Sequence, residues 1–277
     1  MEIRNAKIDG GDAFDWGRTS ADYARFRDIY PPEFYEHILR RNCGTAGQRM
    51  LDLGTGTGVL PRNLVQFGGI WTGTDISENQ VAKARELSAG MPIDYTVSSA
   101  ETVSFPDNTF DGITACQCYW YFDDAKVAPR LFRMLKPGGK LLLLCMEWLP
   151  FEDPVACASE QLVLRYSPNW SGAGETLHPI PVSPDMQRQL RLTFHEEYLL
   201  DVPFTRESWN GRMKACRGIG ASLAAGTDRP VGTGAPEDAG GTGTGALYRQ
   251  ALRRSCGVAK TGVIGISLKA QSPPCVQ

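Results

Sequence analysis

The feature that most constrains the fold is a loop in which glycine alternates with other residues, directly after a short apolar stretch. Residues 49–53 predict a buried strand, and glycine then occupies positions 54, 56 and 58. Glycine allows close approach of a ligand to the backbone and tolerates positive φ. The helix predicted over residues 59–67 would present free N–H groups at this loop. With an acid two residues before the first glycine, a nucleotide-like ligand is favoured over a plain glycine turn.

The glycine spacing argues against two common phosphate-binding loops. A dinucleotide fingerprint requires G-x-G-x-x-G, and Val59 stands where its last glycine should be. A P-loop requires Lys-Ser or Lys-Thr at its end, and neither is present. The string Asp52-x-Gly54-x-Gly56-x-Gly58 resembles instead the first motif of class I S-adenosylmethionine (SAM) methyltransferases. A dinucleotide-dependent oxidoreductase is the weaker alternative.

A second acid ends the next predicted strand, residues 70–75. Asp75 lies where a carboxylate can accept hydrogen bonds from both ribose hydroxyls of a nucleoside. The alternative is an acid that stabilises the N-terminus of the following helix. That helix start is marked by Ser77 as N-cap and by Gln80 as its capping-box partner.

Two later motifs follow in the order expected for this family. Residues 105–111 (FPDNTFD) resemble a signature of the UbiE-like branch, in which Asp111 is more often structural than catalytic. Residues 135–139 (LKPGG) resemble the turn before the fifth strand. The resemblance implies an α/β fold, namely a Rossmann-like, doubly wound, mostly parallel sheet flanked by helices. An N-terminal helical cap is expected before it.

The resemblance also implies SAM as the cofactor and a set of residues that bind it. The segment Tyr-x-x-x-Arg-x-x-Tyr-Pro at residues 23–31 resembles a segment that lies near the methionine end of SAM in the family. Tyr23 and Arg27 are the candidates in it, and Arg25 is an alternative to Arg27. An acid and a small residue after the third strand, predicted over 94–97, correspond to the adenine-binding pair. The expected cofactor-binding residues are Tyr23, Arg27, Asp52, Gly54, Gly56, Gly58, Asp75, Ile76, Ala100, Glu101 and Gln117.

The acceptor is expected beyond the fourth strand, predicted over 110–116, because ligands of open α/β sheets bind at the carboxyl ends of strands. Gln117 is the candidate that lies between cofactor and acceptor. Tyr119 and Trp120 are expected to line the methyl-transfer pocket.

A general base is needed only if the acceptor must lose a proton, and Glu147 and His178 are the candidates. Residues 167–184 contain Trp170 and His178 in a Pro- and Gly-rich loop. This loop is either an acceptor lid or a plain surface insertion.

Composition excludes several other classes. The net charge of −2 gives no reason to expect nucleic acid as a partner, and no apolar run is long enough to span a membrane. Neither a signal peptide nor a metal-binding cluster is evident, so a metal-independent cytoplasmic enzyme with a small-molecule acceptor is predicted. The eight cysteines show no C-x-x-C pair and are expected to be reduced. The sequence does not determine the oligomeric state.

The composition of the chain divides it into three parts. Residues 1–44 are predicted as the cap, and 45–222 as the methyltransferase domain with an acceptor-side insertion at about 147–190. Residues 223–277 are rich in Gly, Ala, Thr and Pro, which predicts poor order and leaves an incomplete last strand as an alternative. Only 263–268 has the composition of a last strand. A degenerate SAM-binding protein that no longer transfers methyl groups is therefore a second alternative.

Overall fold

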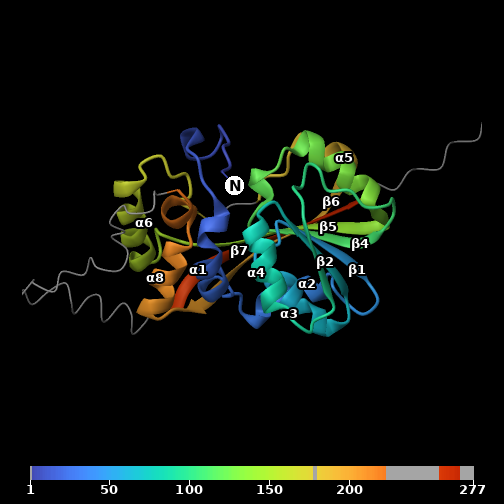
Figure 1. Ribbon diagram of the computed structural model, residues 1–277, viewed down its shortest axis with the longest axis horizontal. Coiled ribbons are helices and arrows are strands. Elements are labelled where there is room, and N and C mark those ends of the chain that lie inside the picture. Colours follow the sequence, from blue (N-terminus) through green and yellow to red (C-terminus); the bar gives the residue numbers. More distant parts are fainter. Residues whose placement is uncertain (1, 177–179, 223–255, 269–277) are drawn as a thin grey trace, which may run out of the picture.

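A single seven-stranded sheet organises the computed structural model, which describes residues 2–176, 180–222 and 256–268 (Figure 1). The strand order is β3-β2-β1-β4-β5-β7-β6, and β7 is antiparallel to both of its neighbours. The chain steps outward from β1 to β3 and then returns beside β1 as β4, so the switch point lies between β1 and β4. The strands are β1 (Arg49–Leu53), β2 (Ile70–Asp75), β3 (Ile93–Val97), β4 (Phe110–Cys116), β5 (Leu135–Trp148), β6 (Leu190–Pro203) and β7 (Cys256–Leu268).

Helices cover both faces of the sheet because successive strand residues point to opposite sides. Along β5, residues 141 and 143 belong to a buried cluster with α5 (Asp124–Met134). Residues 142 and 144 belong to the opposite cluster, with α2 (Pro32–Arg40) and α3 (Val59–Leu64). The run of four leucines is thus apolar throughout because it is buried on both faces, as in other parallel strands.

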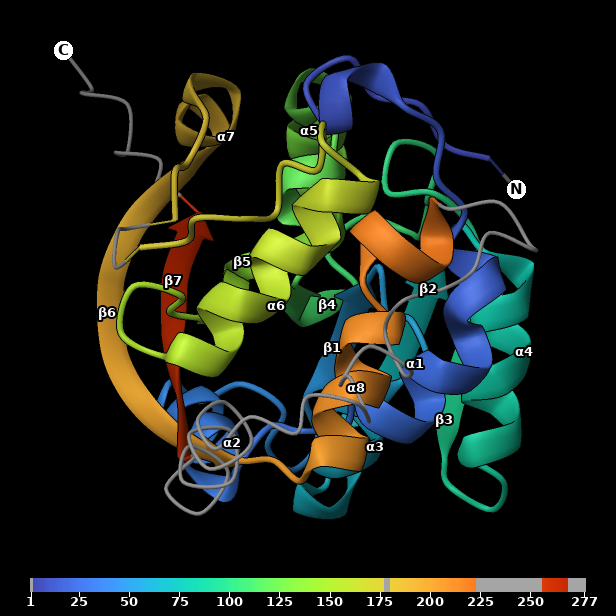
Figure 2. The same ribbon diagram turned by 90° about the vertical axis from the view of Figure 1, so that its left-hand side faces the viewer.

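The other helices complete the flanks and build a second layer beyond one end of the sheet. Figures 1 and 2 show α1, α6 and α8 gathered at that end, and α1 packs against α8. These helices are α1 (Ser20–Phe26), α4 (Glu78–Leu87), α6 (Pro154–Tyr166), α7 (Pro184–Gln189) and α8 (Arg206–Lys214), with a short π-helix η5 (Arg217–Ala221) and 3-10 helices η1 (Asp9–Gly11), η2 (Trp16–Thr19), η3 (Val65–Phe67) and η4 (Tyr119–Tyr121).

The two later motifs meet across the sheet. Asp111 accepts a hydrogen bond from the backbone N–H of Arg49 at 2.8 Å and forms an ion pair with Lys136 at 2.8 Å. The structural assignment of Asp111 is therefore confirmed. The Lys-Pro-Gly-Gly segment, residues 136–139, bulges from β5, since Leu135 pairs with Phe110 and Lys140 already pairs with Gly112. This excursion corresponds to the predicted turn.

The sheet also includes part of the atypical tail. The expected strand at 263–268 lies within β7, which begins earlier, at Cys256, and runs between β5 and β6. Residues 223–255 and 269–277 lie outside the described residues, so their predicted poor order stays a prediction. The three domain boundaries stay predictions as well.

Candidate functional site

The glycine loop connects β1 to α3 with three residues in the left-handed region. The φ angles of Gly54, Gly56 and Gly58 are +59°, +57° and +76°. A Cβ on Gly54 would lie 2.8 Å from the Cys118 sulfur, and one on Gly58 would collide with the Tyr95 hydroxyl. At Gly56 a Cβ would meet only a Tyr23 ring carbon at 3.6 Å. Packing thus requires glycine at the outer two positions, whereas backbone conformation requires it at the middle one.

Asp75, at the end of β2, is tied to this loop. One carboxylate oxygen accepts from the Gly56 N–H at 2.9 Å and the other from the Ser77 N–H at 2.8 Å. Burial raises the pKa of Asp75, and these two backbone hydrogen bonds partly offset the increase. Each oxygen keeps a second lone pair that can accept a hydrogen bond from a ligand hydroxyl, and Asp75 lines the pocket described below.

Only half of the predicted capping box forms at the start of α4. The Ser77 side chain accepts from the Gln80 N–H, as expected. The Gln80 side chain does not return to Ser77. It donates instead to the Trp16 carbonyl at 3.2 Å, and this bond ties α4 to η2. The other side-chain atom of Gln80, Oε1, is buried without a hydrogen-bond partner among the described residues, and Gln80 lines the pocket.

Asp52 lies beneath the loop rather than on the pocket surface. It is 2% exposed, and its carboxylate accepts from the Thr114 hydroxyl at 2.6 Å. Burial raises its pKa to about 7, against the opposing effect of that hydrogen bond. Near neutral pH this carboxyl group therefore lies between its charged and neutral forms.

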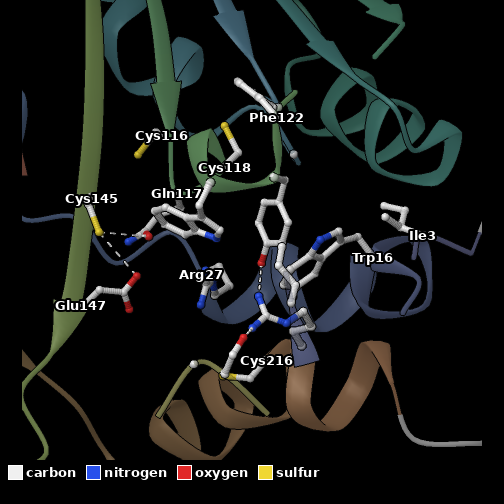
Figure 3. A pocket seen from close by; sticks show the side chains of 18 of the residues that line it. Ile3, Trp16, Arg27, Cys116, Gln117, Cys118, Phe122, Cys145, Glu147 and Cys216 are labelled. Carbon is white, nitrogen blue, oxygen red and sulfur yellow. Dashed lines mark hydrogen bonds between the residues drawn. The ribbon is translucent and has the colours of Figure 1, made fainter. Parts of the chain in front are cut away.

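A pocket of about 560 Å³ extends from the glycine loop to the ends of β4 and β5. This volume is in the range of small-molecule sites. Gly54, Gly56, Asp75 and Ile76 line it, and their cofactor-binding role stays a prediction. Other lining residues come from separate elements, and Figure 3 labels Arg27, Cys116, Gln117, Cys145 and Glu147 among them. Tyr23, Trp120, Trp148 and Trp170 line the pocket as well.

Gln117 and Glu147 lie on the same wall and are bridged by a thiol. Gln117 has a φ of +60°, and its side-chain N–H group donates to the Met146 carbonyl. The Cys145 sulfur lies 3.7 Å from the Gln117 side-chain oxygen and 3.6 Å from a Glu147 carboxylate oxygen (Figure 3). Burial raises the pKa of Glu147, and Arg212 and Arg27 reduce that effect. A carboxylate with a raised pKa suits a general base near neutral pH.

The N-terminal aromatic segment divides between packing and the pocket. Tyr30 stacks on Phe34 with ring centroids 4.4 Å apart, and Phe34 is fully buried. Tyr23 and Arg27 face the pocket, with the Arg27 guanidinium carbon 4.8 Å from the Tyr23 ring centroid. Arg25 points elsewhere and pairs with Glu207 at 2.6 Å. The segment therefore packs on the core through some residues and lines the pocket through others, and its role toward SAM stays a prediction.

Several predicted residues lie away from the pocket wall. Ala100 is buried in the core cluster, and Glu101 accepts from the Asp123 N–H at 3.1 Å. Their adenine-binding role stays a prediction. Tyr119 was expected to line the pocket, which is wrong because its hydroxyl donates to Asp124 at 2.9 Å and its ring joins the core. His178 lies outside the described residues.

Four cysteine thiols in this pocket were not predicted from the sequence. Cys116, Cys118, Cys145 and Cys216 all line it. Burial raises the pKa of Cys116 to about 12 and also raises those of Cys118 and Cys145, so these thiols are protonated. No group of three His, Cys, Asp or Glu side chains arranged for a metal ion occurs in the described part of the chain.

A buried ion pair, also unpredicted, closes one side of the pocket. Asp9 accepts from two nitrogens of Arg217 at 2.6 and 2.9 Å, and both side chains are buried. The Ser171 N–H donates to Asp9 at 2.7 Å, and Arg217 also donates to the Tyr121 hydroxyl. Three segments that are remote in sequence are thereby joined around one guanidinium.

Among helices of the described residues, none has the length and apolar character needed to cross a membrane. The cytoplasmic location stays a prediction.

Comparison with known proteins agrees with this geometry. A family model described as "Methyltransferase domain" matches residues 51–143, which include the glycine loop and both later motifs. An uncharacterized methyltransferase of Mycobacterium tuberculosis is 32% identical over 133 residues, covering 48% of this chain and 52% of the relative. The ubiquinone biosynthesis O-methyltransferase of Pseudomonas aeruginosa is 28% identical over 160 residues, covering 56% and 68%. The chain thus spans about half the length of the mycobacterial relative.

A solved structure has a similar fold over most of the chain. The crystal structure of the MccD protein covers 86% of this chain and 97% of its own, with a TM-score of 0.50 and 15% identity. At that identity the likeness concerns the fold alone. The family model and the relatives agree with the arrangement of strands around a glycine loop: residues 51–143 form a methyltransferase domain, and the chain is similar to S-adenosylmethionine-dependent methyltransferases.

Proposed function

We propose that this protein transfers a methyl group from SAM to a small organic acceptor by in-line displacement. The observation that carries the proposal is a single pocket that joins the glycine loop and Asp75 to Gln117 and Glu147. The residues present fit the cofactor. Gly56 lines the pocket without a side chain, and Asp75 beside it has oxygen lone pairs available to a ligand hydroxyl.

The proposed roles follow from what each group offers. Asp75 would accept hydrogen bonds from a ribose diol, and Arg27 beside Tyr23 would hold the carboxylate of the methionine end. The adenine would contact Ile76, Ala100 and Glu101. The loop with Gly54, Gly56 and Gly58 would let the cofactor approach its backbone closely. Asp52, which lies beneath the glycine loop, would help to hold the methionine end of SAM through the backbone of that loop. The cofactor, when bound, supplies an already activated methyl group.

The protein's own contribution is positioning, exclusion of water and, for a protic acceptor, removal of a proton. Gln117 would lie between the cofactor and the acceptor, and Glu147 on the same wall would act as the base. His178 is kept as a second candidate base. If Glu147 accepts the proton, Glu147→Gln should lower kcat by about 100-fold or more while leaving cofactor affinity unchanged.

Two other functions are tested by the same experiment. A dinucleotide-dependent oxidoreductase is disfavoured by Val59, which stands in place of the third fingerprint glycine. A binding protein without turnover is the other candidate, because the tail differs from what the family resemblance leads us to expect.

Calorimetry with S-adenosylhomocysteine (SAH) and with NAD tests the cofactor. We expect micromolar SAH affinity, no NAD binding, and a loss of at least about tenfold in SAH affinity for Asp75→Ala, which is about 1.4 kcal/mol. Asp94→Ala is the control, since Asp94 is an exposed acid on the neighbouring strand β3. NAD binding, or equal SAH affinity in both variants, would contradict the proposal. Transfer of labelled methyl to a small-molecule extract separates an enzyme from a binding protein.

A further inference from the structure

Arg212 of α8 is a buried cation on the pocket wall. Arg212 is 4% exposed, and its guanidinium carbon lies 4.6 Å from the Trp148 ring centroid. One of its nitrogens donates to the Cys216 sulfur at 3.2 Å. Sulfur is a weak acceptor, and a guanidinium has five N–H donors. Within the described residues, no carboxylate oxygen lies within 4.0 Å of Arg212, so most of its hydrogen-bonding capacity is unused.

The second buried arginine of this region shows what a structural guanidinium looks like in the same protein. Arg217 lines the same pocket, yet Asp9 binds it through two nitrogens, and Ser171 accepts a further hydrogen bond at 2.9 Å. A buried charge without such a partner is costly to the folded state. The contrast indicates that Arg212 is kept for a partner that the protein itself does not supply.

The surroundings of Arg212 favour an anion. Arg27 lies on the same pocket wall, and after burial its positive charge is the main cause of the lowered pKa of Arg212. Glu147 opposes this effect only in part. The guanidinium lies over the Trp148 ring, a contact that uses its charge and none of its N–H groups. Those N–H groups match the two oxygens of a carboxylate.

We infer that the methyl acceptor is an organic acid whose carboxylate is bound by Arg212, with Trp148 and Trp170 against its apolar part. This inference rests on the proposed function, in which Arg27 serves the cofactor. A carboxylate suits the site better than a phosphate, because Glu147 lies on the same wall and would repel a dianion more strongly. The carboxylate anchors the acceptor, and methylation takes place at another atom directed toward Gln117.

The test uses acetate as the smallest carboxylate probe and acetamide as its neutral analogue. Both are titrated into the full chain saturated with SAH, at constant ionic strength, with binding followed by ligand-observed NMR. We expect acetate to bind in the millimolar range and acetamide at least about tenfold more weakly. Arg212→Gln should lower acetate affinity at least about tenfold, with Arg212→Lys between the two. SAH affinity should stay within about twofold of that of the unmodified protein.

Arg165→Gln is the matched control, since Arg165 is an exposed arginine at the end of α6. It should change neither titration. The inference is overturned if acetate binds no more tightly than acetamide, if acetate does not bind up to about 100 mM, or if Arg212→Gln keeps the original acetate affinity. The acetate–acetamide comparison needs no variant, so it decides even if Arg212→Gln fails to fold. Failure of the proposed function is seen separately, as absence of SAH binding in the unmodified protein.

Discussion

Replacing Asp52 by asparagine should make the cofactor-free protein more stable at alkaline pH. Asp52 is buried, and burial raises its pKa from an ordinary value of 3.8 to about 7. Between those two values the folded state holds a proton that the unfolded chain has released. Raising the pH through this window therefore destabilises the folded state. Asparagine keeps an oxygen that can accept from Thr114 and never becomes charged.

The size of the effect follows from the pKa difference. A change from 3.8 to about 7 corresponds to roughly 4 kcal/mol of unfolding free energy once both states have lost the proton. About 3 kcal/mol of this builds up between pH 5 and pH 8. The advantage of Asp52→Asn over the unmodified protein should therefore grow by about 3 kcal/mol across that range.

Urea unfolding at pH 5 and pH 8, without cofactor, measures this difference. Asp94→Asn serves as control, because Asp94 is exposed and its stability difference should change by less than about 0.5 kcal/mol. A difference between Asp52→Asn and the unmodified protein that stays constant with pH would refute the reasoning. The reasoning would also fail if the advantage of Asp52→Asn over the unmodified protein were smaller at pH 8 than at pH 5.

Three further perturbations address the loop, the closure of the pocket and α8. Gly56→Ala and Gly90→Ala both place alanine at positive φ, and each should lower the unfolding free energy in urea by about 1 kcal/mol. Only Gly56→Ala should weaken SAH binding in calorimetry, since Gly56 lines the pocket and Gly90 does not. Asp9→Asn should lower the unfolding free energy by about 3 kcal/mol by leaving Arg217 without its carboxylate; a loss below about 1 kcal/mol would contradict this. Thr205→Ala removes the cap of α8 and should cost about 1 kcal/mol, measured by thermal unfolding.

The sequence predicted best where a local rule fixes the backbone. The bounds of β1, β2 and β4 are as expected. For β1 the reason is plain, because its apolar run stops at Gly54. Asp75 was placed correctly at the end of β2, since its position depends only on the length of that strand and the preceding helix.

Prediction was weakest where a contact joins remote segments. The pairing of Asp9 with Arg217 spans 208 residues, and nothing local to either residue indicates it. Arg212 resembles any other helix arginine until the packing of α8 against the pocket is known. Tyr119 illustrates the opposite error, because a strand-end aromatic satisfied its hydroxyl inside the protein rather than facing the ligand.

The position of β7 has a consequence for how the chain folds during its synthesis. Among the last three strands, the one synthesised last lies in the middle, between β5 and β6. While residues 256–268 are still inside the ribosome, β6 has no neighbour to pair with, and one edge of β5 stays open. The first five strands can assemble beforehand from contacts between consecutive segments, whereas this edge must wait. During that interval the unpaired edge of β5, rich in leucine, is the part of the nascent chain that most needs protection from aggregation.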